Sequence, residues 1–98
     1  MTLQDFKASL GGSTPPADLT APLQALWQDA KGDWNKAHRL AQATDDADGA
    51  WVHAYLHRKE GDLGNAAYWY NCAGRKQSQV SLNEEWMQIV SELLAADE

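Results

Sequence analysis

Three histidines are the side chains of this sequence whose type and spacing best suit metal chemistry. His53 and His57 are four residues apart, so on a helix both project from one face, one turn above the other. His38 lies about as far before segment 44–47 as His53 lies after it, so antiparallel helices joined there would bring the two level. Glu60, about one turn beyond His57, could add an oxygen ligand. Such a set of His38, His53, His57 and Glu60 suits zinc or another divalent transition metal.

The same histidines also have a structural interpretation, which the sequence alone favours. His38 would be a partly buried core residue bonded across a helical hairpin, while His53 and His57 would line a polar seam or face water. Ala54 follows His53, so the pair lacks the glutamate of the metalloprotease signature. The sequence also lacks a phosphate-binding glycine loop, a nucleophile elbow and a Cys-x-x-Cys pair, so we expect no enzyme activity.

Charge and cysteine content narrow the class of protein. The formal net charge of -6 opposes binding to phosphate backbones and anionic lipids, so we expect neither a nucleic-acid nor a membrane partner. Apolar runs fall far short of the ~20 residues that span a bilayer. The single cysteine, Cys72, cannot form an internal disulfide, and the start of the chain has no secretory signal pattern, which predicts a cytoplasmic protein. We expect Cys72 itself to be a small buried hydrophobe.

Capping signals and glycines divide the chain into helices. Thr2 and Asp5 have the spacing of a capping box, and Gly32 and Gly61 are each followed by an aspartate that can cap the next helix. A Gly- and Pro-rich linker predicts loose packing of the first helix, and the helix after Gly61 is expected to reach about Lys76. We expect one helical domain, 1–98, made of a short helix and flexible linker (1–18), hairpin 1 (19–43), hairpin 2 (46–76) and a helix capping the open end of the stack (81–96).

The two turns have matching sequences, Gly32-Asp33-x-x-x-Ala37 and Gly61-Asp62-x-x-x-Ala66, and Tyr70 and Ala73 follow the second. These small and aromatic positions resemble the tetratricopeptide repeat, a helix-turn-helix unit. The resemblance covers about residues 19–76. It implies an all-α, tetratricopeptide-like stack of two antiparallel helical hairpins with a C-terminal capping helix and a short N-terminal helix. Residues 51–75 also resemble small bacterial proteins of no established function.

The resemblance further implies a binding groove lined by the first helix of each hairpin. The matching residues share one face of the predicted helix and offer two aromatic rings and two cations to an extended peptide or an acidic chain terminus: Asp48, Trp51, Tyr55, Arg58 and Lys59. The alternative is that Trp51, Val52, Tyr55 and Leu56 form a core stripe from which Lys59 reaches outward.

Three consecutive aromatic residues, Tyr68, Trp69 and Tyr70, must point in different directions around a helix, so not all can be core. An exposed aromatic often marks a contact with another molecule, and this makes a homo-oligomer possible. From the sequence alone, the leading hypothesis is a non-enzymatic module that binds a protein or peptide and needs no cofactor. The alternative hypothesis is a small zinc-type metal-binding protein that uses the three histidines.

Overall fold

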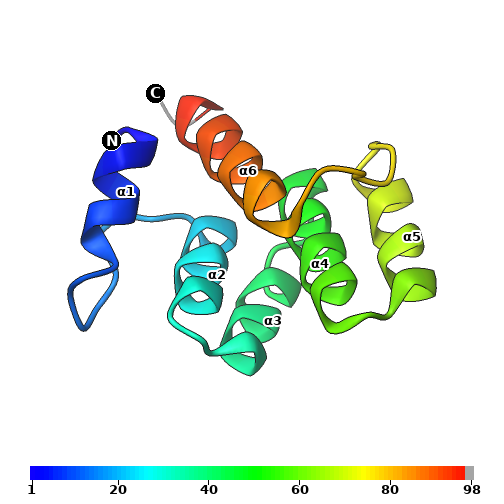
Figure 1. The fold of residues 1–98 in the computed structure, drawn as a ribbon, viewed down its shortest axis with the longest axis horizontal. Helices are drawn as coiled ribbons and strands as arrows, with labels where there is room; N and C mark the ends of the chain where they lie inside the picture. The colour runs from blue at the N-terminus through cyan, green and yellow to red at the C-terminus, as the bar shows by residue number, and fades with distance from the viewer. Residues whose placement is uncertain (97–98) are drawn as a thin grey trace.

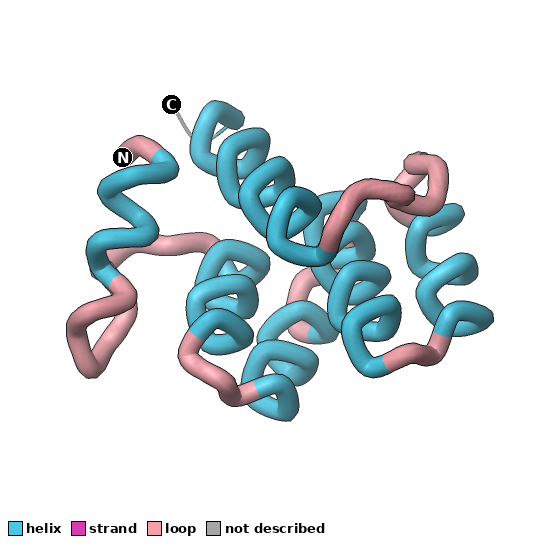
Figure 2. The backbone as a smooth tube through the Cα atoms, in the orientation of Figure 1, coloured by secondary structure: helices cyan, strands magenta, loops and turns pink. Residues whose placement is uncertain are grey.

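The structure is a computed structural model that describes residues 1–96. This part of the chain contains six α-helices and no strands (Figures 1 and 2). The helices are α1 (Leu3–Ser9), α2 (Ala21–Ala30), α3 (Trp34–Gln42), α4 (Ala47–Glu60), α5 (Leu63–Cys72) and α6 (Leu82–Ala96). The expected all-helical fold is therefore confirmed. Within these residues, no helix is both long and apolar enough to cross a bilayer.

The two Gly-Asp turns have the same local structure. Gly32 and Gly61 have φ angles of 91° and 90°, a left-handed conformation that glycine adopts without strain. The following aspartates begin the next helices: Asp33 accepts a hydrogen bond from the Lys36 amide, and Asp62 accepts one from the Asn65 amide. The chain therefore reverses at both predicted positions.

These turns produce two helical hairpins, α2 with α3 and α4 with α5, and α3 packs against α4 to join them (Figure 1). Small residues allow the close approach: Ala25, Ala37, Ala54 and Ala66 are all buried. The turn before α4 is tighter still, because a Cβ atom added to Gly49 would lie 2.4 Å from the Thr44 carbonyl oxygen. This close junction fixes α4 relative to α3.

The first helix is anchored more firmly than the linker sequence predicts. The capping box of Thr2 and Asp5 is present, as expected. Phe6 is fully buried, its ring centroid 5.7 Å from that of Trp86 in α6. The indole N–H of Trp27 donates to the Ser9 hydroxyl, and Lys31 donates to the Leu10 carbonyl. The prediction of a loosely packed first helix is therefore wrong.

The last helix does not stack beyond α5. It lies diagonally across α4 and α2 and reaches α1, and the indole of Trp86 donates to the Leu26 carbonyl in α2 (Figure 1). Ser81 caps this helix by accepting a hydrogen bond from the Glu84 amide, as predicted. The helix is thus a central part of the core, where the sequence suggested a cap on the end of the stack.

The return helix of the second hairpin is shorter than predicted. It ends at Cys72 because Gly74 adopts a left-handed φ of 70°, and the Arg75 amide then bonds back to the Tyr70 carbonyl. Arg75 consequently leaves the helix. Its guanidinium lies 3.4 Å from the ring centroid of Trp51 and forms an ion pair with Glu92 at 2.8 Å.

Candidate metal centre

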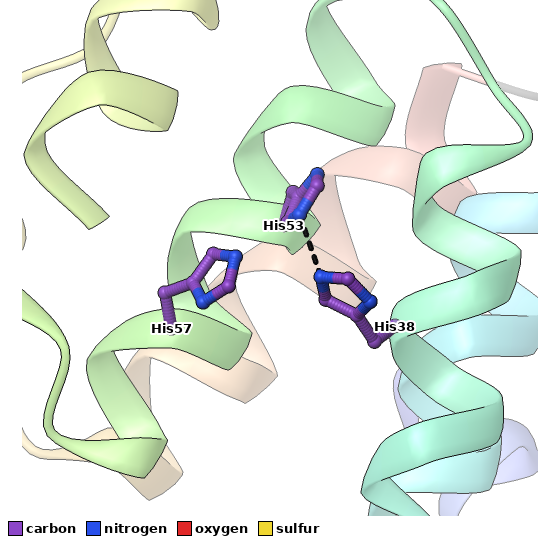
Figure 3. A group of neighbouring side chains, drawn as sticks. All are labelled: His38, His53 and His57. Atoms are coloured by element: carbon purple, nitrogen blue, oxygen red, sulfur yellow. Dashed lines mark hydrogen bonds between the residues drawn. The ribbon is translucent and has the colours of Figure 1, made fainter. Parts of the chain in front are cut away.

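The packing of α3 against α4 brings the three histidines together (Figure 3). His38 projects from α3, and its Nε2 atom lies 2.9 Å from Nε2 of His53 on α4. His57 follows one turn later on α4, and its ring stacks near that of His53 with centroids 4.8 Å apart. One nitrogen atom from each of the three rings lies within 4.8 Å of the other two. The spacing that predicted a level placement of His38 and His53 is therefore matched in the structure.

Aromatic rings hold the histidines in place. Trp34 stacks on His38 with centroids 5.0 Å apart, and Trp69 stacks on His53 with centroids 3.9 Å apart. The indole N–H of Trp34 donates to the Leu56 carbonyl, which fixes that ring. Only 3% of His53 and 6% of His57 is exposed. The four-residue spacing of Trp34 and His38 already places both rings on one face of a helix, whereas no spacing in the sequence places Trp69 beside the cluster.

Glu60 orients His57. Its carboxylate lies 2.6 Å from Nδ1 of His57, which leaves Nε2 of that ring free for another partner. A carboxylate that holds one imidazole nitrogen while the other faces an ion is the usual outer-shell arrangement of metal-bound histidine. Glu60 was a candidate direct ligand in the sequence analysis. The structure gives its carboxylate a different partner, His57 itself.

Burial favours the neutral form of two of the imidazoles, His53 and His38. Desolvation, reinforced by the neighbouring His38 and His57, lowers the pKa of His53 to about 4. Desolvation, and then His57, also lowers the pKa of His38. At neutral pH these two rings therefore carry lone pairs, and the hydrogen bond between their Nε2 atoms requires only one shared proton. A neutral imidazole is the form that binds a metal ion.

The distances suit a tetrahedral ion after small movements. Zn–N bonds of about 2.0–2.1 Å place neighbouring ligand nitrogens about 3.3–3.4 Å apart in a tetrahedral site. The Nε2 atoms of His38 and His53 are closer than this, at 2.9 Å, and the full set lies within 4.8 Å. Shifts of about 1 Å or less per ring would therefore reach coordination distances. Three nitrogen ligands would leave a fourth position open.

Comparisons with protein-family models, curated proteins and solved structures found no match to this chain. The function must therefore be argued from the site itself.

The aromatic residues of the expected peptide groove are buried. Trp51 and Tyr55 are 5% and 3% exposed, because α6 covers this face of α4. The Trp51 indole donates to Glu85, and the Tyr55 hydroxyl donates to Asp29. The core-stripe interpretation is therefore correct for these two residues, and each reaches only the wall of a separate surface cavity, Trp51 beside Arg75 and Tyr55 beside Lys59.

The two groove cations bind carboxylates of the same chain. Arg58 pairs with Glu85 at 2.8 Å and also donates to the Val80 carbonyl, while Lys59 pairs with Asp29 at 3.0 Å. Asp29 and Glu85 are 4% and 1% exposed, and the sequence analysis identified neither as a core residue.

Asp48, the remaining groove residue, is exposed. Desolvation and the nearby Asp46 raise the pKa of its carboxyl group. It lies at the start of α4, where its charge favours the helix N-terminus.

The three consecutive aromatics divide as expected: Tyr70 is buried, Trp69 is half-buried and Tyr68 is 60% exposed. Cys72 is exposed, so the prediction that it is a buried hydrophobe is wrong. It lies one turn after Tyr68 and lines the same cavity as that residue.

Proposed function

We propose that this protein binds a divalent transition-metal ion through His38, His53 and His57. One observation carries the proposal: nitrogen atoms of three histidines from two helices converge within 4.8 Å in a buried, aromatic-walled cluster. Polar side chains are buried at a cost unless they have partners, and these three histidines pair with one another and with Glu60. The same ring nitrogens are suitable ligands for one shared ion.

The donor set indicates the class of ion. Imidazole nitrogens suit zinc, copper, nickel and iron, whereas magnesium and calcium require oxygen ligands. A divalent ion on three neutral rings would keep its double positive charge. Glu60, bonded to His57, and Asp62, whose carboxylate lies within 4.8 Å of both, supply negative charge beside it. The two carboxylates would balance the double positive charge of the ion, which supports a divalent cation.

The helical frame that we propose for the site is tetratricopeptide-like. The two Gly-Asp turns, the small residues between paired helices and the contact of α3 with α4 support this arrangement. The frame places ligands on both sides of the α3–α4 junction, so ion binding would join the two hairpins. Metal binding replaces the peptide-binding module as our leading hypothesis, because the aromatic residues of that groove are covered by α6.

Cobalt titration of chelator-treated protein tests the proposal. Nitrogen-ligated tetrahedral Co²⁺ should give visible absorption bands that saturate at one equivalent and disappear when Zn²⁺ displaces it. His53→Ala should abolish the bands, whereas Cys72→Ser should retain them, since the Cys72 thiol does not belong to the three-histidine group. Equal binding by wild type and His53→Ala would contradict the proposal.

A thermal scan provides a second measurement. An ion that binds only the native protein raises its stability by about 2.7 kcal/mol at a free concentration of 100 times Kd. We expect Zn²⁺ to raise the Tm of the wild type and of Cys72→Ser but not of His53→Ala.

A further inference from the structure

A cavity of about 530 Å³ lies beside the histidine cluster, where turn 43–46 joins α3 to α4. We call it the turn cavity. Its wall includes Asp45 and Asp46 from the turn, Tyr68 and Trp69 from α5, and His53 from the cluster. His53 thus belongs both to the cluster and to the cavity wall.

The two ring nitrogens of His53 face different surroundings. Nε2 is bonded to His38, whereas no hydrogen bond reaches Nδ1 within residues 1–96; every fully buried side-chain polar atom of these residues has a partner, so Nδ1 keeps some contact with solvent. Figure 3 shows Nδ1 pointing away from His38 and His57, toward the end of the helices where the turn cavity lies. A side chain that is only 3% exposed therefore presents a free polar atom on the cavity side.

The charge of the turn cavity favours cations. Asp45 and Asp46 are exposed at its wall, and none of the described residues that line it is Lys or Arg. Two other cavities differ in this respect, since one is lined by Arg75 and the other by Lys7 and Lys59. A cleft lined by one sign of charge concentrates ions of the opposite sign and speeds their association.

The fold around the cluster is complete with hydrogen bonds of its own. His38 bonds His53, and His57 bonds Glu60. The helices that carry them are capped, and their core is packed from residues of all six helices. The cluster therefore satisfies these hydrogen bonds without an ion, and an ion bound by both Nε2 atoms would require the donor ring to carry its proton on Nδ1 instead.

We propose that the turn cavity is the entrance through which a divalent cation reaches and leaves the three histidines while the protein stays folded. The inference rests on the proposed function and deepens it: the site exchanges its ion, as a carrier or a sensor of ion concentration would, and does not hold it as a permanent part of the fold. Asp45 and Asp46 attract the ion, and His53 receives it.

Stopped-flow measurement of Co²⁺ association tests the entrance. Trp69 stacks on His53, so bound Co²⁺ should quench its fluorescence and provide the signal. Asp45→Asn removes a negative charge from the cavity wall and Gln42→Lys adds a positive one, so each variant makes the wall more positive by one unit. Asp45 makes no side-chain hydrogen bond in the part of the chain described, unlike its neighbour Asp46. Asp18→Asn and Gln79→Lys make the same changes at exposed positions outside the cavity.

We expect the association rate constant to fall about threefold or more in the two cavity variants at low salt and to stay near the wild-type value in the two controls. Raising the ionic strength should reduce the difference. Chelator-treated wild type should keep its helical circular dichroism and a cooperative thermal transition.

Three outcomes are informative. Equal rates in all four variants, with Co²⁺ binding that still requires His53, would overturn the entrance and leave the proposed function standing. Loss of helical structure on chelation would overturn exchange in the folded state. Binding that does not require His53 would overturn the proposed function, and the inference with it.

Discussion

Nε2 of His38 lies 2.9 Å from Nε2 of His53, and this contact joins α3 to α4. The two rings are nearly perpendicular, at 85°, with centroids 4.6 Å apart. One ring must donate and the other accept, so the contact exists only while at least one of the two is neutral. The junction of the two hairpins is therefore sensitive to protonation.

The first prediction concerns pH. The folded-state pKa of His53 is about 4, below the ordinary value near 6.5, so the unfolded chain binds this proton more readily. The stability from His53 is thus present above pH 6.5 and is lost as pH falls through 4. The loss should reach at most about 3 kcal/mol. Urea unfolding of chelator-treated protein at pH 7 and pH 4.5 measures it. His53→Asn should show a smaller pH dependence, and identical profiles would contradict the prediction.

The second prediction concerns Glu60, which holds Nδ1 of His57 at 2.6 Å. Glu60→Gln should weaken Co²⁺ or Zn²⁺ binding about 10–100-fold, the usual cost of losing an outer-shell partner, without abolishing it. Competition with a chromogenic chelator gives the affinity. Asp18→Asn removes the same charge at a distant exposed position and should change the affinity little. Complete loss of binding in Glu60→Gln would instead indicate a direct ligand.

The third prediction concerns Glu85, which is 1% exposed and accepts hydrogen bonds from Tyr70 at 2.6 Å and Arg58 at 2.8 Å. Glu85→Ala leaves Arg58 without its buried partner and should lower the free energy of unfolding by about 3–5 kcal/mol. Chemical denaturation measures the change. Glu92→Gln breaks the exposed pair with Arg75 and should cost about 1 kcal/mol or less. Similar losses in the two variants would be inconsistent with a buried network.

The fourth prediction compares two glycines on either side of Asp62. Gly61 has a φ of 90°, so Gly61→Ala should destabilise the protein by about 1 kcal/mol or more. Gly64 is helical, and an added Cβ would meet no atom within 4 Å, so Gly64→Ala should stabilise by about 0.4–1 kcal/mol. Thermal unfolding of the two variants should shift the Tm in opposite directions. A shift of the same sign in both would refute the turn geometry.

Local signals in the sequence were sufficient for the helices and for the histidine cluster. The turns at Gly32 and Gly61 need a left-handed residue followed by a cap, and the pair Gly-Asp meets both needs. Once these turns and segment 44–47 are fixed, the rise of an α-helix places His38 level with His53. The cluster was predictable because it depends on one pair of neighbouring helices.

Features that depend on distant helices were not predictable. The apolar stripe of α6 shows which of its faces is buried, but not that α4, α2 and α1 bury it. A peptide groove and a core stripe both use residues on one face of a helix, so the spacing of Trp51 and Tyr55 fits either interpretation. Only the position of α6, which buries both side chains, decides between the two. Glu85 resembles an ordinary surface residue in the sequence, because its partner Arg58 comes from another helix.

The position of α6 also affects how the chain folds during synthesis. The Trp86 indole binds the Leu26 carbonyl across 60 residues, and Phe6 packs on the same indole. While the ribosome is still adding residues after α5, the apolar surfaces of α1, α2 and α4 that α6 covers therefore remain exposed. The nascent chain would expose this apolar surface until α6 emerges, and any protection against aggregation has to act during that interval.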